Sequence, residues 1–79
     1  MWHRTTQIKI KGQKVDVILY LDVNNEGEEQ ICFRAMMNEY FMTFEIVIGD
    51  DRDLAHSLIK NFPIETIQVK MESLAYANG

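Results

Sequence analysis

The side chains best suited to covalent catalysis in this chain are its single cysteine, Cys32, and its two histidines, His3 and His56. A nucleophilic cysteine needs an accessible, electropositive site and a base within hydrogen-bonding reach. Cys32 stands between Ile31 and Phe33 in an alternating segment, so we expect it in mid-strand, on the face away from the core, as an unreactive thiol. The spacing of the two histidines matches no metal-ligand motif.

Carboxylates are concentrated in the segment Asp50-Asp51-Arg52-Asp53, and their oxygens could bind a hard cation such as Mg²⁺ or Ca²⁺. Acidic residues at such a position also cap the free N–H groups at the start of a helix. Neither an EF-hand spacing nor a catalytic lysine accompanies them, so we favour the helix cap. We therefore expect no metal and no cofactor.

His56 follows Asp53 by about one helical turn and precedes Lys60 by about one turn. A buried His–Asp pair can orient a general base. The apolar stripe expected for this helix leaves His56 facing water, however. A metal-dependent or Cys/His enzyme therefore ranks last among the functional hypotheses, and the sequence does not support an enzyme.

Length and charge limit the alternatives. The chain has 79 residues, which we interpret as one domain spanning residues 1–79, and its net charge is −4 from 12 acidic and 8 basic side chains. This balance argues against nonspecific binding to nucleic acid or to an anionic membrane. A lone cysteine fits a reducing compartment, and the first residues lack the apolar region of a signal peptide. We expect a cytoplasmic protein with no membrane association.

Apolar and polar residues alternate in four consecutive segments, at about residues 4–11, 14–23, 30–37 and 40–48. Alternation of this kind is typical of strands that bury one face. The segments are separated by short turn sequences. The pattern therefore predicts a four-strand antiparallel meander.

The first turn sequence is Lys11-Gly12-Gln13-Lys14. It suits a two-residue type II′ turn with glycine first. This turn would pair Ile10 with Val15. It would also set Lys9 opposite Asp16, a favourable cross-strand charge pair.

The two later turns predict the remaining registers. A three-residue loop at 25–27, with its glycine in the left-handed position, pairs Leu19 with Phe33. A two-residue loop at 38–39 pairs Phe33 with Phe44. A slip of one residue in any hairpin would turn a whole apolar set to the opposite side of the sheet. All three turns instead place the apolar sets on one face, which gives the sheet a defined second face.

The period changes from that of a strand to that of a helix after Gly49. We expect the apolar stripe of this short amphipathic helix to pack on one face of the sheet. Pro63 disfavours helical geometry in the residue before it, so the helix should end near Asn61. The stripe consists of Leu54, Ala55, Leu58, Ile59 and Phe62.

The segment at about residues 65–72 alternates again, with Ile67, Val69 and Met71 on one side. We interpret it as a fifth strand. The preferred order is 5-1-2-3-4, which is antiparallel throughout, and the alternative places this strand parallel to the fourth. The predicted fold class is thus α+β: a four-strand antiparallel meander, one amphipathic helix on one face, and a fifth strand.

The second face of the sheet is unusually apolar for a surface exposed to water. The residues expected to form an interface there are Ile18, Tyr20, Arg34, Met36 and Phe41. A second copy of the chain or another protein would cover this face. The alternative is that the C-terminal tail, with Leu74 and Tyr76, folds over it.

Acidic residues gather at the end of the sheet where the loop at 24–29 and the start of the helix meet. We expect Glu28, Glu29, Asp50 and Asp51 to represent this acidic end, with Arg4 and Arg52 as the opposing cations. A concentration of one charge can steer a basic partner or compete with nucleic acid for a basic site. The alternative is that loops and helix starts attract acids in any protein.

Three functional hypotheses follow. The first is a small non-catalytic protein-interaction or regulatory module, a homodimer or the partner of another protein, that acts through the apolar second face and the acidic end. The second is a single-stranded nucleic-acid binder, which the net charge disfavours. The bases of the bound strand would stack on Tyr20 and Phe41, and Lys9, Lys14 and Arg34 would contact its phosphates. The third is the metal-dependent or Cys/His enzyme.

Overall fold

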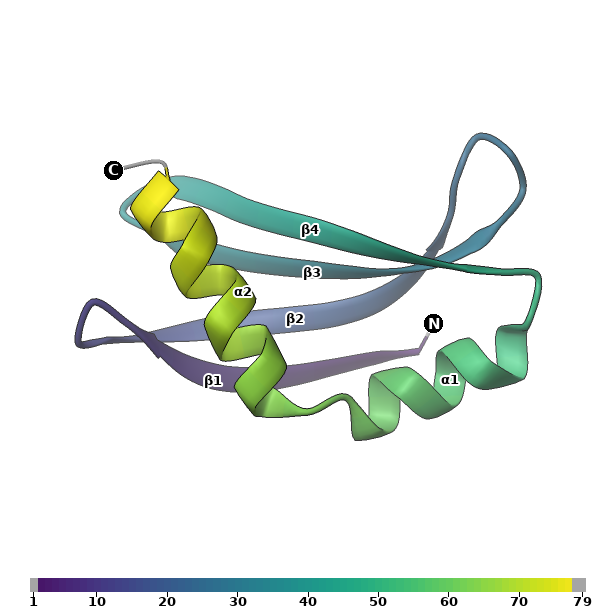
Figure 1. Ribbon diagram of the computed structural model, residues 1–79, viewed down its shortest axis with the longest axis horizontal. Helices are drawn as coiled ribbons and strands as arrows, with labels where there is room; N and C mark the ends of the chain where they lie inside the picture. Colours follow the sequence, from purple (N-terminus) through teal and green to yellow (C-terminus); the bar gives the residue numbers. More distant parts are fainter. Residues whose placement is uncertain (1, 78–79) are drawn as a thin grey trace.

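A computed structural model describes residues 2–77, and it shows an α+β fold in which a four-stranded antiparallel sheet precedes two helices (Figure 1). The sheet order is β1-β2-β3-β4, as in a simple meander. The strands are β1 (His3–Ile10), β2 (Gln13–Val23), β3 (Glu29–Met37) and β4 (Tyr40–Gly49), and the helices are α1 (Arg52–Asn61) and α2 (Ile64–Ala77).

The registers of the second and third hairpins are confirmed. Leu19 lies opposite Phe33, and Phe33 lies opposite Phe44. Gly27 has a φ of +78°, a left-handed conformation that favours glycine. In the two-residue turn between β3 and β4, Asn38 and Glu39 both have positive φ, of 50° and 73°. Both angles fit a type I′ turn, which matches the twist of the flanking strands.

The predicted register of the first hairpin is wrong by two residues. The turn residues are Lys11 and Gly12, with φ of 51° and 78°, so the turn is type I′ and begins one residue earlier than expected. Lys9 therefore lies opposite Lys14 rather than Asp16. A shift of two residues leaves every side chain on its predicted face, because the side-chain period of a strand is two.

The apolar sets of the four strands meet both helices in one hydrophobic core. The Phe33 ring stacks on Phe44, with centroids 4.2 Å apart, and meets the edge of Phe62 at 4.9 Å. The core thus joins the central strand β3 and the edge strand β4 to the segment between the helices. Its buried residues are Ile8, Ile10, Val15, Val17, Leu19, Ile31, Phe33, Ala35, Met37, Met42, Ile59, Ile67, Met71 and Ala75.

Helix α1 begins and ends where the sequence predicts. The Asp51 side chain accepts a hydrogen bond from the Leu54 N–H at 3.0 Å, which makes Asp51 the N-cap. Phe62, the residue before the proline, is extended, with a ψ of 130°. Ala55 and Ile59 are fully buried. Leu54, expected on the apolar stripe, is instead 46% exposed.

Arg4 does not lie among the acidic side chains, as the sequence suggested, but at the C-terminal end of α1. Its Nη1 donates to the carbonyl oxygens of Phe62 at 2.9 Å, Ile59 at 3.3 Å and Lys60 at 3.4 Å. These carbonyl groups have no partner within the helix, and a cation there also interacts favourably with the helix dipole. Arg4 therefore ties β1 to the end of α1.

The predicted fifth strand is wrong, because these residues form α2. Ile67 and Met71 lie four residues apart and are fully buried, whereas Val69 between them is 69% exposed. A strand would have placed all three on one side. The Ile67 N–H donates to the Pro63 carbonyl at 3.4 Å, so the proline stands where its missing N–H costs nothing, at the start of the helix. Residues 2–77 contain no fifth strand, so the predicted order 5-1-2-3-4 is also wrong.

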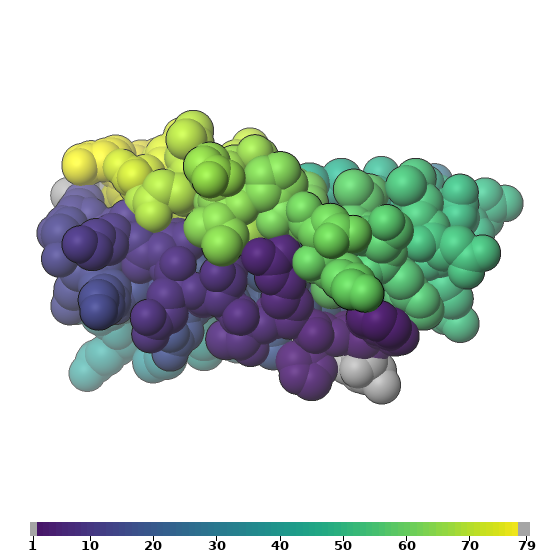
Figure 2. Space-filling model, turned by 90° about the horizontal axis from the view of Figure 1, so that it is seen from below, coloured from purple at the N-terminus to yellow at the C-terminus, as the bar shows by residue number. Residues whose placement is uncertain are grey.

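Both helices pack on the same face of the sheet. Buried residues from α1 and α2 belong to one core with the inward side chains of the strands, and Figure 2 shows the helices together on one side of the strands. Leu74 packs against this core, so the C-terminal segment does not cover the second face as the alternative proposed. Neither helix among residues 2–77 has the length and apolar character needed to cross a membrane.

Candidate functional site

The sheet face that points away from both helices, which we call the outer face, carries the exposed apolar side chains predicted for an interface. Met36 on β3 and Phe41 on β4 are cross-strand neighbours, 57% and 52% exposed. Ile18 on β2 is 37% exposed. Large apolar side chains that lie together and half-exposed are typical of a surface that becomes covered by another molecule.

Arg34 lies within this apolar group. It is opposite Ile18 on one side and Thr43 on the other, in the row next to Met36 and Phe41. Its guanidinium carbon lies 3.8 Å from the centroid of the Phe41 ring, close enough for a cation–π interaction. The outer face therefore combines apolar contact area with a positive charge that lies against one of its aromatic rings.

Tyr20 differs from the other predicted interface residues because it is only half-exposed, beside the buried Cys32 on the next strand. Burial raises the pKa of the Tyr20 hydroxyl, and the neighbouring thiol adds to this effect. Burial also raises the pKa of the Cys32 thiol, with the Glu45 and Asp22 carboxylates acting in the same direction. The thiol is 5% exposed and accepts a hydrogen bond from the Gln30 amide at 3.6 Å. Cys32 is thus protonated and shielded at neutral pH, unlike a catalytic thiol.

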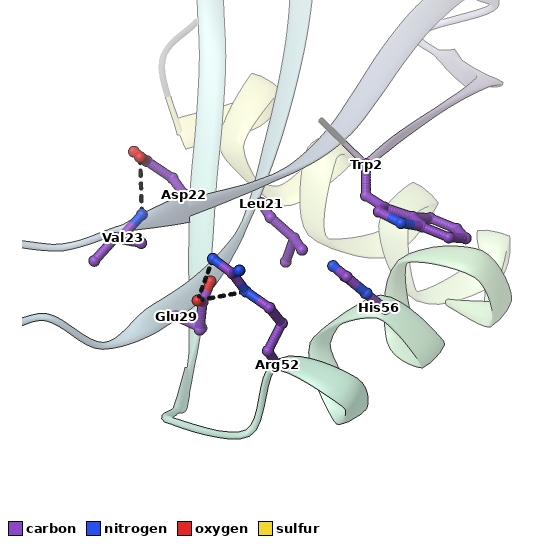
Figure 3. A pocket seen from close by; sticks show the side chains of 7 residues that line it. All are labelled: Trp2, Leu21, Asp22, Val23, Glu29, Arg52 and His56. Atoms are coloured by element: carbon purple, nitrogen blue, oxygen red, sulfur yellow. Dashed lines mark hydrogen bonds and ion pairs between the residues drawn. The ribbon is translucent and has the colours of Figure 1, made fainter.

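Cys32 and His56 are not brought together. Cys32 points to the outer face from β3, whereas His56 belongs to α1, which packs on the opposite face. The His56 ring instead stacks on Trp2, with centroids 5.0 Å apart and planes at 23° (Figure 3). Cys32 and His56 therefore have no common site, and His3, which lies opposite Tyr20 on β1, is two strands away from Cys32.

An open cleft of about 400 Å³ lies beside this aromatic stack, at the acidic end of the sheet. Its polar part is the ion pair between Arg52 and Glu29, in which Nε and Nη2 of the arginine both lie 3.0 Å from Oε1 (Figure 3). Its lining residues are Trp2, Leu21, Asp22, Val23, Glu29, Arg52 and His56.

Sequence reasoning missed this cleft. Nothing in the local pattern joins Trp2 to a helix more than fifty residues away. The proximity of Arg52 to Glu29 could have been predicted from the strand register. Gly49 lies opposite Glu29, which brings the start of α1 to that end of β3.

Most of the carboxylates expected at the acidic end have partners within the chain. Glu29 pairs with Arg52, and Asp51 caps α1. Glu28 accepts a hydrogen bond from the Asn24 amide at 3.2 Å. Asp50 is exposed in the bend that follows β4. Among residues 2–77, no group of three or more His, Cys, Asp or Glu side chains is arranged to hold a metal ion.

The comparisons with known proteins do not add to this description. No protein-family model matches the chain, and neither a curated protein nor a solved structure matches it.

Proposed function

We propose that this protein is a small non-catalytic interaction module that binds a protein partner on the outer face of its sheet. The observation that carries the proposal is the pair Met36 and Phe41, both more than half exposed and side by side on a face that neither helix covers. An exposed apolar group of this kind is costly unless another surface removes it from water.

Arg34 indicates the chemistry of the partner. Arginine beside an aromatic ring is a common centre of protein interfaces, because it combines apolar contact with a fixed fork of donors. Among residues 2–77 the one ion pair joins Arg52 to Glu29, so Arg34 has no carboxylate partner of its own. We propose that the partner presents apolar side chains next to a carboxylate that pairs with Arg34.

The other parts of the functional hypothesis remain proposals. The acidic end would steer a basic region of the partner, although Glu29 pairs with Arg52 and Asp51 caps α1. A cytoplasmic location is also proposed, on the ground that the lone cysteine, Cys32, is free and buried.

Single-stranded nucleic acid remains the second candidate. The corrected register favours it at one point, since Lys9 and Lys14 are now cross-strand neighbours on the outer face and make a small basic spot. The net charge of −4 and the half-buried Tyr20 count against it. Retention of single-stranded RNA or DNA on a filter at low salt would support this candidate, and its absence would contradict it.

The protein-binding proposal is tested by placing a photo-reactive residue at position 36 in living cells, with position 69 as the control. Val69 is 69% exposed on α2, on the opposite side of the molecule. We expect one protein to be captured repeatedly at position 36 and not at position 69. Equal capture at the two positions would contradict the proposal.

The captured protein is then purified and its binding measured by calorimetry. We expect Met36→Asp to raise the dissociation constant about tenfold or more, and Val69→Asp to leave it unchanged. Arg34→Glu should weaken binding more than Arg34→Gln if the partner supplies a carboxylate. Undiminished binding of Met36→Asp would remove the outer face as the docking surface.

A further inference from the structure

The two edges of the sheet, β1 and β4, differ in how their free main-chain groups are occupied. In a hairpin with a two-residue turn, the residues that flank the turn are hydrogen-bonded to each other, and every second residue beyond them is too. The residues in between direct their N–H and C=O groups away from the partner strand. This rule identifies which groups lie on each free edge.

On β1 the free groups belong to alternate residues, including Lys9, because Ile10 and Gln13 flank the turn. The structure agrees with the rule at this position. The Lys9 N–H donates to Oε1 of Gln68 at 2.9 Å, and Nε2 of Gln68 donates to the Lys9 carbonyl oxygen. At Lys9, a side chain of α2 therefore occupies the position that another strand would take beside β1.

On β4 the same rule assigns the free main-chain groups to four alternate residues, since Met37 and Tyr40 flank the turn. Among residues 2–77, no side chain forms a hydrogen bond with the main chain of β4 that resembles the one from Gln68 to β1. The four residues are Phe41, Thr43, Glu45 and Val47.

Strand β4 also lacks the side chains that usually protect an edge. It contains no proline, no lysine and no arginine, and its single charge is Glu45. Natural edge strands are commonly short, or carry lysine or proline, because an open edge pairs with other strands. A ten-residue edge of this composition is therefore suited to receive another strand.

We propose that β4 pairs with β4 of a second copy of this chain, antiparallel, about a twofold axis at Phe44. In this register Phe41 lies opposite Val47 of the second copy, and Thr43 lies opposite Glu45 of the second copy. The four pairs formed would supply about eight main-chain hydrogen bonds, two for each pair. The two sheets become one continuous sheet of twice the width.

The sequence of β4 selects a second copy as the occupant because the strand is complementary to itself. Its outward-bonding residues are apolar at both ends and polar in the middle, so apolar meets apolar and polar meets polar about Phe44. Phe41 and Val47, 52% and 53% exposed in the single chain, become cross-strand partners. Phe44, which is only partly buried, meets its own counterpart on the core side.

The neighbouring registers are less favourable. A shift of the twofold axis to Glu45 would place two carboxylates directly opposite each other. A shift of the axis to Thr43 would oppose Phe41 to Glu45. The register centred on Phe44 avoids both arrangements.

The first experiment measures the mass of the protein by sedimentation from micromolar to millimolar concentration. We expect a dimer. We expect Thr43→Pro to raise the dissociation constant of the dimer about thirtyfold or more, because each copy loses one hydrogen-bond donor. The Thr43 N–H faces away from β3, so the proline removes no bond within the sheet. Thr5→Pro is the matched control, since Thr5 is exposed and faces away from β2 on the other edge. A monomeric wild-type protein throughout, or an equal effect of the two prolines, would overturn the proposal.

The second experiment tests the register and does not depend on the proline variants. Two Cys32→Ser chains, one with Thr43→Cys and one with Glu45→Cys and a tag of different mass, are mixed and oxidised. We expect the mixed disulfide-linked dimer to exceed either like dimer, because positions 43 and 45 face each other. An excess of the 43–43 or 45–45 dimer would show one of the shifted registers, and an absence of covalent dimer would contradict pairing at β4. Because Met36 lies on β3, Met36→Asp tests the outer face separately.

Discussion

Replacement of Arg4 by glutamine removes the side chain that ties the first strand to the end of α1. Its guanidinium reaches three main-chain carbonyl oxygens, at 2.9, 3.3 and 3.4 Å, and two of these contacts are partly buried. A hydrogen bond to a charged group contributes about 1.5–3 kcal/mol, and the charge at the helix end adds about 0.3–1 kcal/mol. The two longer contacts are weak. We therefore expect Arg4→Gln to reduce the free energy of unfolding by about 2 kcal/mol.

Chemical denaturation followed by circular dichroism measures this loss, and thermal unfolding should show a Tm lower by about 8–16 °C. Lys14→Gln is the matched control, since it removes the same charge from an exposed side chain on β2, and it should change stability by less than about 0.5 kcal/mol. Arg4→Lys keeps the charge without the planar fork and should fall between the two. If Arg4→Gln and Lys14→Gln have the same effect, the carbonyl contacts do not stabilise the fold and this reasoning is refuted.

Two further predictions concern α2 and the buried thiol. Met71→Ala should destabilise the protein by about 2–5 kcal/mol in urea unfolding, because Met71 is fully buried, whereas Val69→Ala should change stability by less than about 0.5 kcal/mol; equal effects would favour a strand over the helix. Because burial raises the pKa of the Cys32 thiol, the native protein holds this proton to a higher pH than the unfolded chain does. Stability should therefore fall as the pH rises above the thiol pKa of the unfolded chain, and Cys32→Ala should lessen that fall; an unchanged pH dependence would speak against this cause.

The strands were predictable because their signal is local and repeated. Alternation fixes which side of the sheet Leu19, Phe33 and Phe44 occupy, and two turn sequences fix their partners. The first turn misled the register because Gly12 fits either the first or the second turn position, and both choices keep the same faces. A two-residue error therefore leaves no contradiction in the hydrophobic pattern.

The second helix was missed because one set of residues satisfies two periods. Ile67 and Met71 are separated by four positions, which is one helical turn and also two strand repeats. Val69 between them favoured the strand. The buried Ala75, a further four residues on, continues the helical spacing beyond the end of the strand prediction. Pro63 itself also suits the start of a helix.

The outer face was predictable in outline and the cleft was not. Met36 and Phe41 lie on the outer face because alternation assigns them there, and the structure shows them exposed together. Tyr20 has the same assignment but is half-buried. Its exposure depends on how the neighbouring side chains pack around it, and periodicity does not describe that packing. The stack of Trp2 on His56 joins distant parts of the chain and has no local signature.

The hydrogen bonds between Gln68 and Lys9 have a consequence for how large an assembly can become. A sheet that is open at both sides can add copies without limit, and such growth ends in fibres. Here the Gln68 amide occupies the main-chain groups of Lys9, so a strand that approached this part of β1 would have to displace it. In the dimer proposed above, β4 is used up in both copies, so further growth would have to begin at β1, where Gln68 stands in the way.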